Sequence, residues 1–411
     1  MVHPKLRFKR EDGTNYPDWE RKKLDDVGTV AMCKRVLKEQ TSETGDVPFF
    51  KIGTIGSKAD AYISRDLFEK LKTKFSYPKR GNVLLCAAGT IGRPVVFDGE
   101  DAYFQDSNIV WLKHDDSVMD SFLYQFYLQA NWDKLEGGTI KRLYNGLLLD
   151  KDISVPCIDE QHKIADFLST VDEVIAQSEA EVQNLEQQKK GVMQKIFSQE
   201  VRFRCEDGTS YPEWINTTFS ETFSVLNNNT FSRDMLSEGG TVCNIHYGDI
   251  LVKFGEVCDI QTADTPKVNA NINTDKYDKL KDGDIVIADT AEDETVGKAI
   301  EIYGVGANEV VSGLHTMACR PNSKFAPKYL GYYINSPSYH NQLIPFMQGI
   351  KVTSIGRKNI ADTVIYYPTC LEEQQKIADF LSAYDEAISG AKQELEKWKE
   401  LKKGLLQQMF V

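Results

Sequence analysis

Long hydrophobic runs are missing from this chain of 411 residues. No uninterrupted apolar stretch approaches the ~20 residues that a membrane helix needs, and the first residues, MVHPKLRFKREDG, lack the apolar core of a signal peptide. We therefore expect a cytoplasmic protein with no membrane contact. The 41% hydrophobic and 27% charged residues are typical of a globular protein, and the length suggests two or more domains.

Spacings typical of metal sites are missing as well. The eight cysteines are scattered, form no CxxC pair, and do not lie near histidine with zinc-finger spacing. We expect reduced cytosolic thiols and no metal. The six histidines show no triad-like or ligand-like spacing. We take them as structural by default, with His246 and His315 as candidates for a recognition surface in the second half of the chain.

The chain also lacks an excess of positive charge and a nucleotide-binding motif. Its 49 Lys and Arg against 61 Asp and Glu give a net charge of −12, which argues against a simple electrostatic binder of nucleic acid. The sequence contains no GxxxxGK[ST] phosphate loop, so we expect no ATP motor of that type.

What the sequence does contain is an internal repeat. The lead-in RFKREDGTNYPDW at 7–19 returns as RFRCEDGTSYPEW at 202–214, and EQHKIADFLS at 160–169 returns as EQQKIADFLS at 373–382. Each half therefore has a short lead-in, a long variable region and a shared C-terminal segment. The predicted boundaries are 1–158 and 199–371 for two globular domains, and 159–198 and 372–411 for the helices that follow them.

The two variable regions differ in residues but keep the same order of elements. GNVLLCAAGTIGRPVVF at 81–97 predicts a strand, a small-residue turn and a second strand, and GDIVIADTAEDETVGKAIEI at 283–302 predicts the same with an acidic turn. An aromatic helix-like run follows in both, and then a glycine-rich basic loop, at 137–146 or 348–359. We expect one α+β scaffold, a strand-rich sheet with a few helices, whose surface differs between the two copies.

The repeated segments carry the pattern of a coiled coil. Apolar positions step 4-3-4-3 from Ile164 and again from Ile377, a period typical of a coiled-coil seam. An antiparallel pair is favoured, because a parallel pair would require the intervening domain to travel the length of a rod roughly 58 Å long. The variable domains would then lie at opposite ends of a spacer. The seam positions are Ile164, Leu168, Val171, Ile175, Val182, Leu185, Ile377, Leu381, Tyr384, Ile388, Leu395 and Trp398.

Lys189 and Lys402 fall on the same seam position of the two copies. A buried lysine there costs stability but fixes register or orientation. The alternative is that both side chains reach solvent at the frayed end of the helix. Of the two, we favour this solvent-exposed interpretation.

The duplicated EQ(H/Q)KIADFLS segments, the GTIG turn after VLLCAA, and the loop GGTIKR before the first helix resemble the specificity subunit of type I restriction-modification systems. The resemblance spans the whole chain, although the second loop, QGIKVTSIGRKN, departs from the first. It implies two target recognition domains, each reading one half of an asymmetric bipartite site on double-stranded DNA. The paired helices would set the gap and dock two methyltransferase subunits. Restriction subunits with an ATP-driven motor would join them in bacterial defence.

The resemblance also implies that this chain is not catalytic and binds no cofactor: S-adenosylmethionine, ATP and Mg²⁺ would be bound by the partner subunits. The Asn/Asp-Pro-Pro-aromatic motif of amino-methyltransferases is missing here. The acidic turn at 289–293 could hold a metal. Capping a turn, or accepting hydrogen bonds from cytosine amino groups, fits it better.

Local positive charge marks the surfaces expected to contact DNA, since phosphates need Lys, Arg or backbone amides, and base edges need Arg, Lys, Asn, Gln, Ser or Thr. Segments 159–198 and 372–411 hold eight acids against four bases and eight against six, so half of the net charge lies on the helices. For a single residue a solvated surface role is the simpler interpretation, but a set on matching loops favours DNA contact. The candidates are Lys72, Lys74, Lys79, Arg80, Thr90, Arg93, Thr139, Lys141, Arg142, Tyr144, Asn145, His246, Thr290, His315, Gln348, Lys351, Thr353, Ser354, Arg357 and Lys358.

A second hypothesis stays open at this point. A bivalent coiled-coil scaffold whose heads bind protein or RNA would show the same repeat. Binding driven by phosphates should weaken steeply with salt, more so for duplex than for protein ligands, and this separates the two hypotheses.

Overall fold

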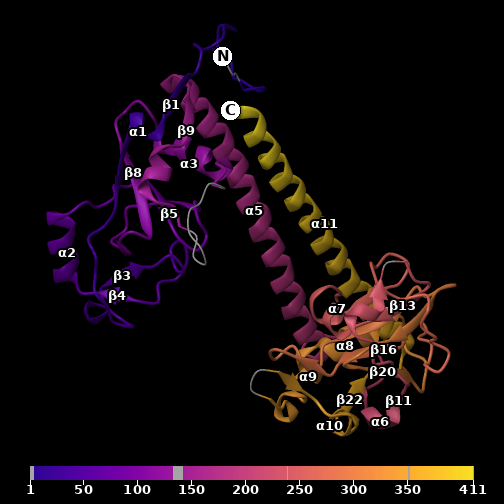
Figure 1. The fold of residues 1–411 in the computed structure, drawn as a ribbon. Helices are drawn as coiled ribbons and strands as arrows, with labels where there is room; N and C mark the ends of the chain where they lie inside the picture. Colours follow the sequence, from indigo (N-terminus) through magenta and orange to yellow (C-terminus); the bar gives the residue numbers. More distant parts are fainter. Residues whose placement is uncertain (1–3, 133–141, 238, 350–351, 411) are drawn as a thin grey trace. The chain divides into compact units, whose positions relative to one another are not determined.

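The computed structural model describes residues 4–132, 142–237, 239–349 and 352–410. The chain divides into two compact units (Figure 1), the first formed by residues 1–180 with 392–411 and the second by residues 181–391. Each unit contains one variable region, here named the first or second head, and a segment of each of two long helices. These helices are α5 (Ile158–Phe197) and α11 (Leu371–Met409).

The first head is built on an antiparallel four-stranded sheet. Its strand order is β2 (Gly28–Ala31), β8 (Ile109–His114), β5 (Val83–Cys86) and β6 (Pro94–Val96). A smaller sheet has the order β4 (Tyr62–Ile63), β3 (Val47–Phe50) and β7 (Tyr103–Phe104), and β1 (Glu20–Lys23) pairs with β9 (Asp152–Val155). The helices are α1 (Leu24–Val27), η1 (Lys38–Gln40), α2 (Arg65–Lys74), α3 (Asp120–Gln129) and α4 (Asn145–Leu149).

The second head has a five-stranded sheet in the order β11 (Phe223–Val225), β20 (Thr316–Pro321), β16 (Ile285–Ala288), β18 (Ala299–Tyr303) and β14 (Val257–Asp259). A four-stranded sheet has the order β12 (Leu236–Ser237), β15 (Lys267–Val268), β13 (Val242–Ile245) and β19 (Glu309–Ser312). The pairs are β10 (Ile215–Thr218) with β22 (Val364–Tyr367), and β17 (Thr290–Ala291) with β21 (Thr353–Ser354). The helices are α6 (Phe219–Thr222), η2 (Arg233–Met235), α7 (Tyr247–Val252), α8 (Tyr329–Asn335), α9 (Pro337–His340), η3 (Ile344–Phe346) and α10 (Arg357–Ala361).

The two heads repeat one topology. The order β11–β20–β16–β18 of the second head matches β2–β8–β5–β6 of the first. In each smaller sheet one strand pair is parallel, β3 with β7 and β13 with β19. An antiparallel pair joins the start and the end of each head, β1 with β9 and β10 with β22. The expected α+β scaffold is confirmed in both copies.

Hydrophobic packing explains the inner strands β5 and β16. Their sequences, VLLC and IVIA, are buried at every position, and strands covered on both faces take continuous apolar runs. The aromatic runs predicted after them fold as helices against these strands: Phe122 of α3 shares a core with Leu85, and Tyr329 of α8 shares one with Ile287.

The repeated lead-in is held by the repeated glutamate near the start of each long helix. In the first unit, Arg7 donates hydrogen bonds of 3.0 and 2.8 Å to the fully buried Glu160, and Trp19 Nε1 donates a third of 3.0 Å. A buried carboxylate is tolerated when it is paired and hydrogen-bonded in this way. The lead-in therefore fixes the beginning of α5 against the head.

The second unit repeats this arrangement with its own residues. Arg202 donates to Glu373 at 2.9 and 3.1 Å, and Trp214 Nε1 donates at 3.2 Å. The next residue, Gln374, is also buried, and it accepts from Ala326 N and donates to the Pro368 carbonyl. The Glu-Gln pair is thus repeated because each head is joined to its helix by the same contacts.

In the first unit, the beginning of α5 packs against the end of α11. Ile164 and Leu168 share a hydrophobic core with Leu406, and Lys402 Nζ donates to Asp172. Low residue numbers of one helix therefore contact high numbers of the other, which confirms the antiparallel pairing. The Lys402 side chain is only 13% exposed. The prediction that this side chain reaches solvent is therefore wrong.

In the second unit, the end of α5 packs against the beginning of α11 in the same antiparallel sense. Ile196 and Ile377 belong to one core. Lys189 Nζ lies 2.5 Å from Asp385 Oδ1 and 2.6 Å from Glu256 Oε2. The residue is only 7% exposed, so the solvent-exposed interpretation is wrong here too: two carboxylates keep the buried ammonium paired.

The named seam positions are buried or half-buried. Those that are buried are Ile164, Leu168, Val171, Val182, Ile377, Leu381, Ile388 and Leu395. Those that are half-buried are Ile175, Leu185, Tyr384 and Trp398.

Candidate functional site

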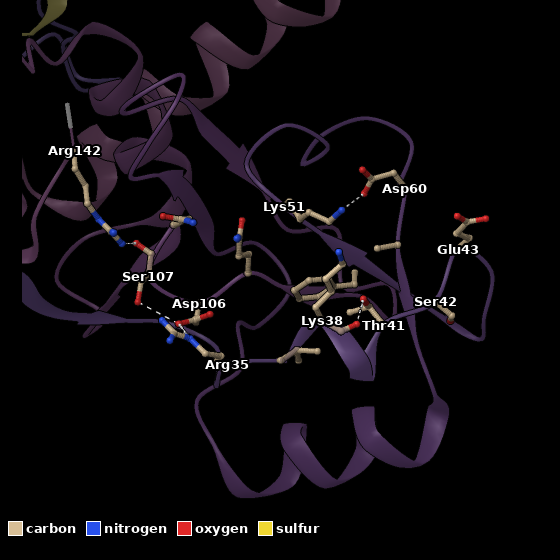
Figure 2. Close-up of a pocket in the computed structure, with 15 residues that line it drawn as sticks. Arg35, Lys38, Thr41, Ser42, Glu43, Lys51, Asp60, Asp106, Ser107 and Arg142 are labelled. Carbon is tan, nitrogen blue, oxygen red and sulfur yellow. Dashed lines mark hydrogen bonds and ion pairs between the residues drawn. The ribbon is translucent and has the colours of Figure 1, made fainter. Parts of the chain in front are cut away.

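A cavity of about 620 Å³ opens on the first head (Figure 2). Four segments far apart in the sequence form it: the stretch from β2 to β3, the residues that follow β3, the turn before β8, and Arg142. Its basic and amide side chains are Arg35, Lys38, Lys51, Gln105, Asn108 and Arg142. Cations and amides together are the groups that contact phosphates and base edges.

Ion pairs orient several of these cations. Arg35 Nε lies 3.0 Å from Asp106 Oδ2, yet the arginine side chain is 67% exposed. Lys51 Nζ lies 2.9 Å from Asp60. Both partners of the Lys51–Asp60 pair are exposed, and exposed pairs are weak, so Lys51 can exchange its carboxylate for an incoming anion.

The structure places only one described residue of the first glycine-rich loop in this cavity. Arg142 is half-buried and donates from its guanidinium to the Ser107 carbonyl at 2.5 Å. Tyr144 and Asn145 begin α4, are exposed, and do not line the cavity. Thr139 and Lys141 lie outside the described residues.

The lysine-rich segment predicted beside the strand pair lies apart from the cavity. Lys72, on α2, pairs with Asp101 at 3.3 Å, and its ammonium lies 4.9 Å from the centre of the Phe68 ring. Hydrogen bonds from Arg65 and Lys72 lower the pKa of Asp101. Lys74, Lys79 and Arg80 are exposed, and like Lys72 they do not line the cavity.

The turn between β5 and β6 is also outside the cavity lining. Thr90 is exposed, and the exposed Arg93 donates to the Ile55 carbonyl at 2.6 Å. The GTIG turn therefore contacts a neighbouring loop of the same head.

In the second head, the pairing of β17 with β21 brings predicted residues together. Thr290 lies opposite Ser354, and Ala291 lies opposite Thr353. Thr290 Oγ1 is 3.3 Å from His315 Nδ1. The acidic turn, the turn before β20 and the second basic loop, three segments far apart in the sequence, thus meet at one place.

Aromatic rings extend this cluster. The centres of the Tyr247 and His315 rings are 5.3 Å apart in an edge-to-face arrangement, and those of His246 and Tyr247 are 4.6 Å apart. His246 is buried, which lowers its pKa, and its Nδ1 accepts from Gly248 N at 3.2 Å. The neutral His246 therefore carries its proton on Nε2.

The rest of the second loop borders the cluster. Arg357 donates to Asn228 Oδ1 at 2.8 Å. Gln348 pairs with Ser354 through backbone hydrogen bonds. Lys358 is exposed, and Lys351 lies outside the described residues.

The two clusters occupy matching positions. The last loop of each head bonds to the residue after the inner strand: Leu143 N donates to the Ala87 carbonyl at 2.8 Å, and Ile355 N donates to the Asp289 carbonyl at 2.9 Å. The same backbone frame therefore presents Arg142 in one head and a mixed polar and aromatic set in the other.

Several residues of these clusters were missed by the sequence reasoning. They are Arg35, Lys38, Lys51, Gln105 and Asn108 in the first head, and Asn228 and Tyr247 in the second. A usable signal was present for Gln105 and Asn108, because the segment before the apolar strand IVWLKH occupies the same place in the repeat as the segment before TMACRP.

Within the described residues, no group of three or more His, Cys, Asp or Glu side chains is arranged to hold a metal ion. In the same part of the chain, every helix is too short or too polar to cross a bilayer.

Comparison with known proteins adds to this geometry. The family model described as "Type I restriction modification DNA specificity domain" matches residues 16–187 and 240–397. A protein of Methanocaldococcus jannaschii named as the type I restriction enzyme MjaVIII specificity subunit is 25% identical over 421 aligned residues, which cover 97% of this chain and 94% of the relative.

A Haemophilus influenzae protein named "Putative type I restriction enzyme specificity subunit" is 58% identical over 146 residues. That match spans 35% of this chain and 38% of the relative's length. Among solved structures, the S subunit of a type I restriction-modification system from M. genitalium has a TM-score of 0.56 at 16% identity, over 100% of this chain and 99% of that one. At this identity the likeness concerns the fold.

Proposed function

We propose that the chain recognises a DNA site in two parts, one with each head. The premise is that the chain belongs to the type I restriction modification DNA specificity domain family. One observation carries the proposal: a single backbone frame is repeated in the two heads and holds different polar side chains at the same place. Different side chains select different bases, so the two half-sites differ and the whole site is asymmetric.

The first-head cavity supplies the chemistry that such a contact needs. Arg35, Lys38 and Arg142 provide charge for phosphates, and Gln105 and Asn108 provide amides for base edges. The net charge of −12 keeps the long-range attraction to DNA weak. Binding by the free subunit is therefore modest, and partner surfaces supply much of the phosphate neutralisation.

The paired helices α5 and α11 set the unread gap in this proposal. A rod of roughly 58 Å cannot span more than about 17 base pairs at ~3.4 Å each. The helices also dock two methyltransferase subunits, which restriction subunits join in the cytoplasm as a bacterial defence complex. Catalysis, and with it S-adenosylmethionine, ATP and Mg²⁺, belongs to those partner subunits.

The test is to express the chain with its methyltransferase and map adenine methylation across a genome. We expect one split motif with two unlike halves. Methylation at no defined motif would contradict the proposal. A bivalent scaffold for protein or RNA would give the same negative result; binding that depends weakly on salt would then indicate a protein ligand.

A double substitution tests the first basic loop. Changing Lys141 and Arg142 to Ala should impair recognition of one half-site and leave the other unchanged. If methylation persists at the same sites, the assignment of this loop to DNA contact is wrong.

A further inference from the structure

Each head holds a residue other than glycine in the left-handed backbone region directly ahead of a matching strand. Ser107 has φ 60° two residues before β8, and His315 has φ 53° immediately before β20. Residues other than glycine rarely adopt this backbone conformation, because their Cβ atom comes too close to the backbone. Such residues persist where their surroundings hold them, and they gather at functional sites.

The arginine of the last loop holds this turn in both heads. Arg142 donates directly to the Ser107 carbonyl at 2.5 Å. Arg357 acts through an amide: it donates to Asn228 Oδ1 at 2.8 Å, and Asn228 Nδ2 donates to the Gly313 carbonyl at 3.1 Å. A guanidinium that is occupied in this way positions the turn and has fewer N–H groups left for DNA.

The contacts of the His315 ring fix which nitrogen carries its proton. Thr290 Oγ1 donates its only hydrogen to Asp289 Oδ1 at 2.9 Å, so toward His315 Nδ1, at 3.3 Å, it acts as an acceptor. In its neutral form the imidazole therefore carries its proton on Nδ1, which also lies 3.6 Å from Asp289 Oδ1, and its Nε2 is then a hydrogen-bond acceptor. The side chain is 47% exposed, and the edge-to-face contact with Tyr247 limits the rotation of the ring.

We propose that His315 is the residue of the second head that selects one base of its half-site, with Nε2 accepting from an exocyclic amino group. The amino groups exposed in the major groove are N6 of adenine and N4 of cytosine, whereas guanine and thymine present oxygen acceptors at the corresponding positions. His315 therefore favours adenine or cytosine. The inference rests on the proposed function and adds to it the chemistry of one contact. Arg357 is a positioning residue that acts through the turn, and Ser107 has the matching place in the first head.

The variant His315→Gly tests this cleanly, because glycine adopts a positive φ without strain. The variant should fold, with an unfolding midpoint equal to or above that of the parent chain. In the methylation map, one position in one half of the motif should lose about 5-fold of its preference for adenine or cytosine. The other half of the motif should be unchanged.

Two further variants sharpen the result. Ser107→Gly relieves a similar backbone strain in the first head. Any loss of base preference in this variant should therefore appear only in the half-site that the first head reads. Arg357→Ala should relax the same position as His315→Gly, and the double variant should add little, because both changes act on one contact.

Three outcomes are informative. Relaxation of one position in one half-site supports the inference. A split motif that is unchanged in His315→Gly overturns the inference and leaves the proposed function in place. A parent chain that directs no split motif overturns both.

Discussion

Lys189 of α5 donates a hydrogen bond to Asp385 of α11 at 2.5 Å, inside the seam between the two long helices. Lys402 and Asp172 make the corresponding pair in the first unit, because both residues recur 213 positions apart in the repeat. The environments differ: Lys189 also contacts Glu256 of the second head at 2.6 Å.

Replacement of Lys189 by Ala should destabilise the second unit. The change leaves Asp385 and Glu256 without their shared cation. Because these carboxylates are 38% and 22% exposed, water solvates them in part, and the expected loss is about 2 kcal/mol, below that for a fully buried pair. The measurement is the free energy of unfolding in urea, followed by a probe in the second head.

Lys190→Ala is the matched control, because Lys190 is the next residue and is exposed. Its effect should stay within about 0.5 kcal/mol. Equal effects of the two variants would mean that the buried pair contributes nothing beyond a surface charge.

Replacement of Glu160 by Gln should loosen the lead-in of the first unit. Gln keeps the shape but removes the negative charge that Arg7 contacts through two hydrogen bonds. We expect a loss of about 2 kcal/mol in unfolding free energy, together with faster proteolysis of the lead-in. Asp166→Asn, an exposed change on the same helix, should alter neither the unfolding free energy nor the proteolysis of the lead-in. An effect as large as that of Glu160→Gln would contradict the conclusion that Glu160 holds the lead-in.

Glu301 gives the second head a pH dependence. Burial raises the pKa of this carboxyl from 4.5 to about 7. Hydrogen bonds from backbone N–H groups favour the charged form and lower the pKa, but their effect is smaller than that of burial. The folded state therefore binds more protons than the unfolded state between these two values. Stability should be highest below pH 4.5 as far as this group is concerned, fall by up to about 3 kcal/mol as the pH rises toward 7, and stay level above.

The variant Glu301→Gln isolates that contribution. Unfolding curves of the two proteins, recorded from pH 5 to pH 8, should differ in slope, with the parent chain losing more stability over this range. Parallel curves would show that Glu301 does not change its protonation on folding in this range.

Arg35→Ala should weaken duplex binding by the methyltransferase complex on all sequences alike. The exposed guanidinium of Arg35 in the cavity is placed to contact a phosphate. Loss of one phosphate contact reduces the magnitude of the negative slope of log K against log salt by about 1. Lys72→Ala is the matched control, since it also removes one cation paired with one aspartate, but outside the cavity. Equal losses from both variants would contradict the choice of this cavity.

The sequence predicted what depends on periodicity and repetition. The alternating steps of four and three residues that begin at Ile164 and Leu168 are enough to define the buried face of a helix, because the spacing alone decides which side chains share a face. The grouping of Thr290, His315 and Ser354 was only partly accessible: each residue could be named as a candidate, but their meeting depends on the pairing of β17 with β21.

The sequence by itself determined two copies of one α+β scaffold, each followed by a long amphipathic helix, since local patterns of apolar residues specify strands and helices. Only the tertiary structure decided which cations face the candidate site. Lys72 lies in a dense run of lysines but pairs outside the cavity with Asp101, whereas Arg35, from the short basic segment 34–38, lines the cavity. Charge density along a chain says little about where side chains gather in space, because chain segments far apart in sequence form the walls of the site.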